Sequence, residues 1–255
     1  MRNLTQMKGY LFVPLFLLIA AFPASSQEIK DDTNPTKPVF LSLREEYYRL
    51  GDNLSRNFVV LRSDKVILSK THLKPKGMIL RWDLHIARTS AGAVTQTGLG
   101  DLYMQSLLFP LLGKFTFVAG SGFVLPTATD SQLGRGKWQM APLAAPLWFF
   151  PQNKGFFFVK FQDFFSFAGN GTRSDVHYFL STATVLWRYT RKSWVLLDTE
   201  TKTNWELDNA TSYRSGIQLG TMLSPNIGLW IKPEIPWAEH REGSWALKFT
   251  FLFAK

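Results

Sequence analysis

Few residues of this sequence have the types and spacing that ester hydrolysis requires. His177 stands four residues before Ser181, and His240 stands close to Glu242 and Ser244. Either set could supply a nucleophile and a base, and the second also an orienting acid. Neither lies in a recognisable nucleophile-and-base motif, so we predict no catalytic residues and no enzyme. A lipid-modifying enzyme is kept only as an alternative.

Metal and cofactor sites are not expected either. The four histidines are scattered over turn, strand and loop without the spacing of metal ligands, and the chain has no cysteine. The segments GLGD and GSGF lack the third glycine and the following helix of a dinucleotide site. We therefore interpret Gly98, Gly100, Gly120 and Gly122 as bulge or close-approach positions in curved strands. The prediction is no cofactor and no metal.

The amino-terminal segment has the features of a secretory signal. A basic start precedes an apolar run from Tyr10 to Phe22, which is too short to span a bilayer, and small residues follow it. We expect a cleaved signal peptide over 1–26, a periplasmic linker over 27–38 and an exported domain over 39–255.

The charge of the chain is strongly basic, with 29 lysines and arginines against 19 acidic residues and a formal net charge of +10. In an exported protein this excess suits outer-membrane lipid, lipopolysaccharide or anionic solutes. No nucleic-acid partner is expected.

Alternation of polar and apolar side chains is the dominant pattern of the exported domain. In WVLLDTETKTNWEL, from Trp194 to Leu207, charged and amide side chains fall on one face, and Val195 and Leu197 fall on the other. Successive side chains of a strand point to opposite faces, so one face is wet and the other is not. Such runs predict about twelve strands. Their ranges are 39–48, 57–69, 77–88, 98–109, 113–125, 137–148, 155–167, 175–189, 193–206, 211–223, 226–238 and 243–254.

The connections between these strands alternate between short turns and longer polar loops. Outer-membrane barrels have this asymmetry and an even number of strands. The segment LWFFPQNKGFFFV (147–159) places three aromatic residues on each side of a short turn, which suits an aromatic girdle at a membrane interface. We therefore predict an all-β transmembrane antiparallel barrel of about twelve strands in the bacterial outer membrane. A soluble β-sandwich with an aromatic core is the alternative.

Several segments resemble one family of small outer-membrane barrels. TGLGDLYMQSLLFP (97–110) and especially VLPTATDSQLGRGKWQMAP (124–142) are similar to the family named after the MetA pathway of phenol degradation, and the later elements FSFAG, TKTNWE and WALKFTFLFAK follow in the family's order. The resemblance covers most of 57–255. It implies a transporter-like outer-membrane barrel, and it implies no catalytic residues.

The polar faces of the predicted strands would line the lumen of this barrel. Both signs of charge occur there, so many of these groups are expected to pair across neighbouring strands. The lumen-lining prediction comprises Arg62, Arg81, Asp83, His85, Asp101, Gln105, Asp198, Glu200, Lys202, Asn204, Glu206, Arg214, Gln218, Lys232, Glu234 and Lys248, with Arg44, Glu46, Asp64, Lys160 and Gln162 on the same faces. The extracellular loop that follows Val124 carries Asp130, Arg135 and Lys137.

These features favour a channel or transporter for small solutes, which could be hydrophobic, aromatic or anionic. The solute itself is unknown from the sequence. A non-conducting barrel that binds lipid or a partner is the second alternative, beside the lipid-modifying enzyme. Outer-membrane lipid, lipopolysaccharide and the outer-membrane assembly machinery are the expected partners.

Overall fold

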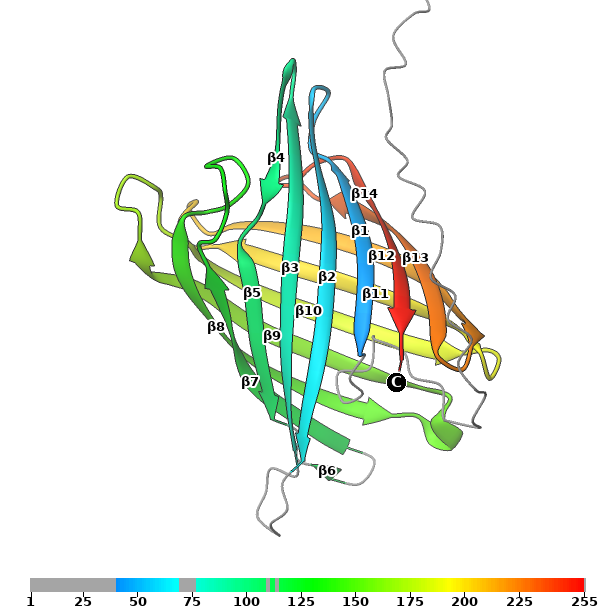
Figure 1. Ribbon diagram of the computed structural model, residues 1–255. Helices are drawn as coiled ribbons and strands as arrows, with labels where there is room; N and C mark the ends of the chain where they lie inside the picture. Colours follow the sequence, from blue (N-terminus) through cyan, green and yellow to red (C-terminus); the bar gives the residue numbers. More distant parts are fainter. Residues whose placement is uncertain (1–39, 69–76, 109–110, 113–114, 255) are drawn as a thin grey trace, which may run out of the picture.

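The chain forms one antiparallel sheet that closes on itself. The computed structural model describes residues 40–68, 77–108, 111–112 and 115–254, so the predicted signal peptide and linker lie outside the described residues. The sheet closes because the last strand pairs with the first (Figure 1). The predicted all-β barrel is confirmed. No helix in this part of the chain is long and apolar enough to cross a membrane.

The wall of the barrel has twelve positions, as predicted. The strands β4, β5 and β6 share one position, because β4 and β5 pair with successive parts of β3, and β5 and β6 pair with successive parts of β7. The elements are β1 (Leu41–Arg49), β2 (Leu54–Leu68), β3 (Gly77–Ala91), β4 (Val94–Leu99), β5 (Leu102–Leu108), β6 (Leu111–Leu112), β7 (Phe115–Leu125), β8 (Lys137–Phe149), the 3-10 turn η1 (Pro151–Asn153), β9 (Gly155–Gly169), β10 (His177–Arg188), β11 (Ser193–Asn204), β12 (Ala210–Ser224), β13 (Ile227–Trp237) and β14 (Trp245–Phe253).

The two ends of the barrel differ in their connections. The turn end carries the short connections 150–154, 189–192 and 225–226, and the loop end carries 126–136 and 170–176 among its connections. Two connections at the loop end are shorter than predicted, namely 50–53 between β1 and β2 and 92–93 between β3 and β4. They are short because the strands themselves extend into hairpins that rise above the loop end (Figure 1).

The hairpin between β3 and β4 shows why its connection is short. Gly92 has a φ of 60°, a conformation that glycine adopts without strain and that tight hairpin turns require. The polar residues predicted to form this loop therefore continue the ladder, with Ala91 paired to Val94.

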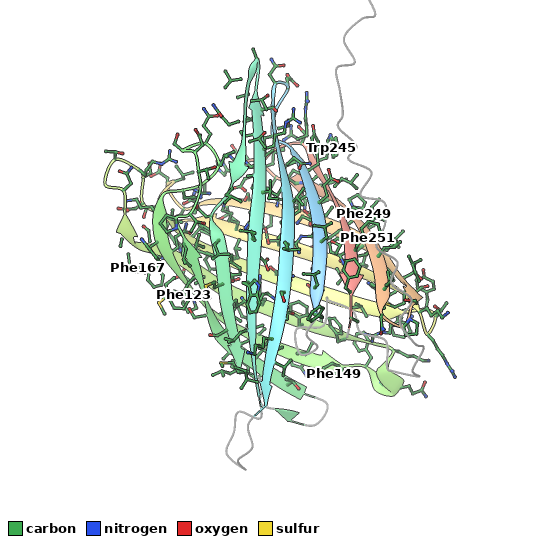
Figure 2. All side chains as sticks on the ribbon, viewed as in Figure 1. Phe123, Phe149, Phe167, Trp245, Phe249 and Phe251 are labelled. Atoms are coloured by element: carbon green, nitrogen blue, oxygen red, sulfur yellow. The ribbon has the colours of Figure 1, made fainter. Side chains whose placement is uncertain are left out.

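The outer face of the barrel is apolar around its circumference (Figure 2). Leu197 on β11 is 50% exposed and Phe167 on β9 is 59% exposed. Aromatic pairs lie toward both ends: the ring centroids of Tyr213 and Trp237 are 4.5 Å apart near the loop end, and those of Trp148 and Phe157 are 5.9 Å apart near the turn end. Such a belt with aromatic borders suits a lipid bilayer and not water, so the barrel is of the transmembrane kind.

Two prolines interrupt the ladder on one side of β8. Pro142 and Pro146 have no N–H to donate, and the pairing of β8 with β9 skips both while the pairing with β7 includes both. The register of β8 against β9 also shifts between Trp138 and Gln139. The seam between β8 and β9 is therefore less continuous than the neighbouring seam between β9 and β10.

Placing a charge on the lipid-facing surface tests this assignment of faces. We expect Leu197→Arg to lower the free energy of unfolding by up to about 2–4 kcal/mol, the cost of a lipid-facing arginine near the bilayer midplane. Lys202→Gln, an inward position on the same strand, should leave it nearly unchanged. Urea titration in lipid vesicles, followed by the gel shift between unboiled and boiled protein, measures both. Equal losses for the two variants would contradict the assignment.

Candidate functional site

The interior of the barrel encloses a cavity of about 1260 Å³. Strands from both sides of the barrel contribute to its walls, together with the connection between β7 and β8. Fifteen of the residues expected in the lumen line it: Arg44, Glu46, Arg62, Arg81, Asp83, His85, Asp101, Gln105, Lys160, Gln162, Asp198, Glu200, Gln218, Lys232 and Lys248.

The other residues expected in the lumen lie close to this cavity or at the rim. The Lys202 Nζ lies 2.5 Å from a carboxylate oxygen of Glu242, and Arg214 lies over the ring of Tyr48. Glu234 is buried between two lysines of the wall. Asn204 ends β11, where its side chain accepts a hydrogen bond from the backbone N–H of Glu206.

Two predicted positions need correction. Glu206 lies beyond the end of β11, in the turn before β12, and it lines a smaller pocket of about 360 Å³ at the loop end. Lys137 is not part of the loop but the first residue of β8, where it is buried and lies 2.7 Å from Asp175 Oδ1. The hydrogen bond from Lys137 lowers the pKa of the Asp175 carboxyl group in its exposed loop.

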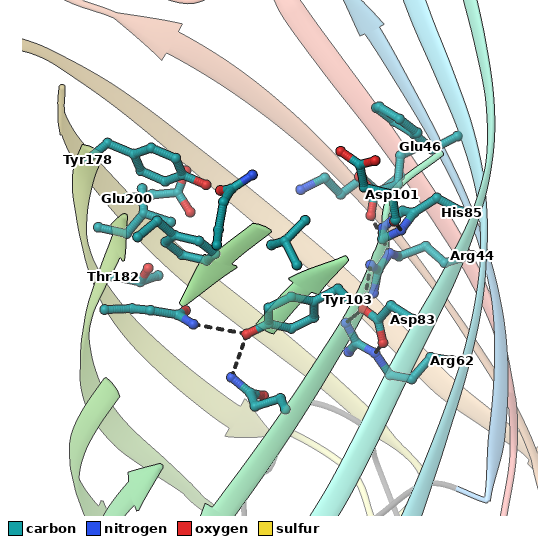
Figure 3. Close-up of a pocket in the computed structure, with 18 of the residues that line it drawn as sticks. Arg44, Glu46, Arg62, Asp83, His85, Asp101, Tyr103, Tyr178, Thr182 and Glu200 are labelled. Atoms are coloured by element: carbon teal, nitrogen blue, oxygen red, sulfur yellow. Dashed lines mark hydrogen bonds and ion pairs between the residues drawn. The ribbon is translucent and has the colours of Figure 1, made fainter. Parts of the chain in front are cut away.

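The wall formed by β2 and β3 carries two reciprocal ion pairs. Arg62 and Asp83 are cross-strand partners, and so are Asp64 and Arg81. Each arginine donates two hydrogen bonds to its carboxylate, at 2.8 and 2.6 Å for Arg62 and at 2.8 Å twice for Arg81. Bidentate geometry makes these the strongest kind of side-chain hydrogen bond. The charges of this wall therefore largely neutralise one another (Figure 3).

The wall formed by β11, β13 and β14 carries a second network. Lys232 forms ion pairs with Asp198 and with Glu234, the latter at 2.8 Å, and Lys248 lies 2.9 Å from the same Glu234 oxygen. Two cations therefore share one nearly inaccessible carboxylate. With Asp198 included, the network holds two cations and two carboxylates, so its formal charges balance.

Three aromatic rings, on β5, β9 and β10, line the cavity, and Figure 3 labels two of them, Tyr103 and Tyr178. The rings of Phe164 and Tyr178 are 4.8 Å apart and nearly parallel, and Tyr103 lies 6.4 Å from Phe164. The Tyr103 hydroxyl accepts hydrogen bonds from Gln105 at 2.8 Å and from Gln162 at 2.9 Å. These three rings were not predicted to line the lumen, although they share the face of Gln105 and Gln162 in the period-two pattern.

The floor of the cavity, toward the turn end, is apolar. Trp194, Phe156 and Leu186 are no more than 1% exposed, and the ring of Trp194 lies so close to Gly220 that a Cβ there would come within 2.2 Å of it. The described side chains fill this part of the barrel as a hydrophobic core, which the sequence pattern did not predict. The floor comprises Leu147, Phe156, Leu186, Trp194, Leu196, Met222, Trp230 and Leu252, with Ile79, Leu107, Val118, Leu143 and Ala145 beside them.

The connection 126–136 folds inward at the loop end. The carboxylate of Asp101 accepts hydrogen bonds from the backbone N–H groups of Ala128 at 3.3 Å and Arg135 at 2.7 Å. Arg173 donates to the backbone carbonyl of Gly134 at 2.9 Å, and Leu133 is buried against the strands. Residues from Ser131 to Arg135 line the cavity, so this loop narrows its mouth. Asp130 accepts a hydrogen bond from the backbone N–H of Gln132 within the loop.

The residues considered for hydrolysis do not assemble into a site. His177 lies 3.4 Å from Asp163, but Ser181 is about 13 Å further along the same strand, given a rise of about 3.3 Å per residue. Glu242 is engaged by Lys202. In the described part of the chain, no group of three histidine, cysteine or acidic side chains could hold a metal ion.

A double-mutant cycle tests the pairing of Arg62 with Asp83. Arg62→Met and Asp83→Leu should each lower the free energy of unfolding, because each leaves one charge unpaired in the wall. The double variant should regain part of the loss, with a coupling energy of about 0.5–3 kcal/mol. Urea titration measures the cycle. Lys65→Met, on the outer side of β2, provides the control with Asp83→Leu and should show no coupling.

Comparisons with known proteins agree with this geometry. No family model and no curated protein matches the sequence. Three solved structures are similar in fold. An outer membrane channel from Pseudomonas putida F1 has a TM-score of 0.70 at 13% identity, over 89% of this chain and 99% of that chain. The NanC porin has a TM-score of 0.59 at 10% identity, over 84% and 100%. The KdgM porin, in complex with disordered oligogalacturonate, has a TM-score of 0.57 at 7% identity, over 84% and 98%. The chain therefore has the fold of small outer-membrane channels and porins.

Proposed function

We propose that this protein is an outer-membrane channel for small solutes and a member of the family named after the MetA pathway of phenol degradation. The observation that carries the proposal is the charged cavity of about 1260 Å³ inside a closed, lipid-facing barrel. The similarity in fold to channels and porins supports it. Lipopolysaccharide on the outer side and the outer-membrane assembly machinery are the partners that this location implies.

The charge of the cavity favours anionic solutes over cationic ones. Basic groups outnumber acidic groups in its lining, and most of the acidic groups are already paired with arginine or lysine or hold the inward loop. Rings of charge in a narrow pore select the opposite sign. The basic lining residues are Arg44, Arg56, Arg62, Arg81, Arg135, Arg173, Lys160, Lys232 and Lys248, and the acidic ones are Glu46, Asp83, Asp101, Asp198 and Glu200.

The apolar floor makes the described conformation a closed one. A non-conducting barrel is the second candidate, and the floor is the observation that favours it. Buried polar atoms near the floor favour a channel that can open. Trp194 Nε1, Thr116 Oγ1 and Thr250 Oγ1 have no hydrogen-bond partner among the described residues. If the floor opened, water would form hydrogen bonds with these atoms. Those bonds would offset part of the free-energy cost of exposing the apolar side chains of the floor to water. We therefore regard the floor as a hydrophobic gate.

Conductance across planar bilayers tests the proposal. The refolded protein should show small openings whose reversal potential in a salt gradient has the sign of anion preference. Trp194→Ala should raise the conductance several-fold, because it removes one of the two tryptophan side chains of the floor. Trp148→Ala, on the outer face, is the control and should not change it.

The outcomes separate the candidates. A folded wild-type protein that conducts only after Trp194→Ala is a channel whose gate is closed at rest. If neither protein conducts although both show the gel shift of a folded barrel, the non-conducting candidate is correct.

The inward loop provides a second test of passage through the lumen. Arg173→Gln removes the hydrogen bonds that hold Ser131 and Gly134, so the loop should be released and the conductance should rise. Deletion of Ser131–Gly136 should raise it further while the gel shift remains. Arg191→Gln, in the short turn between β10 and β11, is the matched control. Unchanged conductance in both loop variants would show that the narrowest point of the lumen does not lie at this loop.

A further inference from the structure

We infer that the cavity binds amphipathic monocarboxylates, with Lys160 holding the carboxylate and the apolar floor holding the hydrocarbon part. The inference rests on the proposed function only in that such a ligand enters from the loop end. It assigns a binding position, whereas the proposed function concerns passage. The two can therefore fail separately.

Lys160 differs from four cations of the cavity wall that are already paired. Arg62, Arg81, Lys232 and Lys248 each have a carboxylate oxygen within 4.0 Å. Lys160 lines the same cavity, yet within the described parts of the chain its ammonium group forms no ion pair or hydrogen bond. An ammonium group in a narrow, partly apolar site is stabilised when an anion joins it.

The charges around Lys160 favour an added anion. The carboxylate of Glu200 attracts it, but the two residues are separated by Thr182 in the cross-strand row, and Glu200 lies beyond ion-pair distance. The cations of Arg62, Arg81 and Lys232 repel it. Each of these three cations already has a carboxylate partner, so the charge of Lys160 stays uncompensated, and a bound carboxylate would neutralise it.

The position of Lys160 along its strand sets the shape of the ligand. On β9, Phe158 precedes Lys160 by two residues and shares its face, so the Cα of Lys160 lies about 7 Å nearer the loop end than the Cα of Phe158. A carboxylate at Lys160 therefore directs an attached chain or ring toward the floor. The apolar side chains that line this part of the cavity are Leu107, Val118, Leu143, Phe158, Leu196 and Trp230.

The chemistry of these two surfaces excludes other ligand classes. A small hydrophilic anion would pair with Lys160 but would leave the apolar floor unused. An alcohol of the same chain length would cover the floor but would leave the ammonium group unpaired. Each buried methylene should strengthen binding roughly fourfold. A chain of four to eight carbons with one terminal carboxylate therefore uses both surfaces.

Titration calorimetry of the refolded full-length barrel tests the inference. The probes are butanoate, hexanoate and hexanol, each corrected with protein-free micelles. We expect hexanoate to bind more tightly than butanoate by at least fivefold. Lys160→Met should weaken hexanoate binding at least tenfold and leave hexanol binding unchanged, while Lys160→Arg should keep hexanoate binding within threefold of the wild type.

Matched variants separate this site from a general loss of charge. Lys202→Gln removes a lumen lysine that is paired with Glu242, and it should not weaken hexanoate binding. Phe158→Ser should abolish the difference between hexanoate and butanoate while butanoate binding persists. The gel shift shows that each variant is folded.

Two results would overturn the inference: equal hexanoate affinity in the wild type and Lys160→Met, or no gain from butanoate to hexanoate. Absence of carboxylate binding with normal bilayer conductance would likewise overturn it and leave the channel intact. Binding as expected, with no conductance in either the wild type or Trp194→Ala, would support the inference and reject the channel.

Discussion

The pairing of β14 with β1 is the interaction on which the rest of the structure depends. In a hydrocarbon layer no water is present to satisfy backbone N–H and C=O groups, so a sheet must close on itself. Nine register pairs between Leu41 and Arg49 on one strand and Phe253 and Trp245 on the other achieve this closure. Once the ring is closed, each residue of the wall faces either lipid or lumen. The sorting of apolar and charged side chains follows from that choice.

The inward-facing side chains of the barrel differ between its two ends. Toward the loop end the wall is polar, and bidentate pairs such as Arg62 with Asp83 hold neighbouring strands together. Toward the turn end the same inward positions carry Trp194, Phe156 and Leu186, which pack as a core. The transition occurs within a few residues on β9, where Lys160 follows Phe158. The charged lining and the apolar lining thus occupy separate levels of one lumen.

Much of the fold could be predicted from the sequence, because period-two alternation is strong where one face is charged. Asp198 beside Leu197 shows both the strand and its inward face. The alternation is uninformative where both faces are apolar, as in GFFFVKF at the start of β9, so the floor could not be distinguished from the lipid-facing belt. The aromatic stack of Tyr103, Phe164 and Tyr178 was missed for a related reason, since rings suit either face. The loop anchor at Asp101 depends on backbone N–H groups far away in the sequence, and no local pattern carries that information.

The prolines of β8 make the backbone pairing of this strand with its two neighbours unequal. β8 pairs continuously with β7 but with gaps to β9, so β7 and β8 form one continuously paired panel of the wall, and β9 and β10 form another. The backbone pairing across the line between these panels is interrupted beside Pro142 and Pro146, and the pairing between β12 and β13 is interrupted as well. Phe158 and Lys160 lie on the β9 side of that line, and Leu143 and Ala145 lie on the β8 side. An interruption of the backbone pairing therefore runs beside the level at which the apolar and charged linings of the cavity meet.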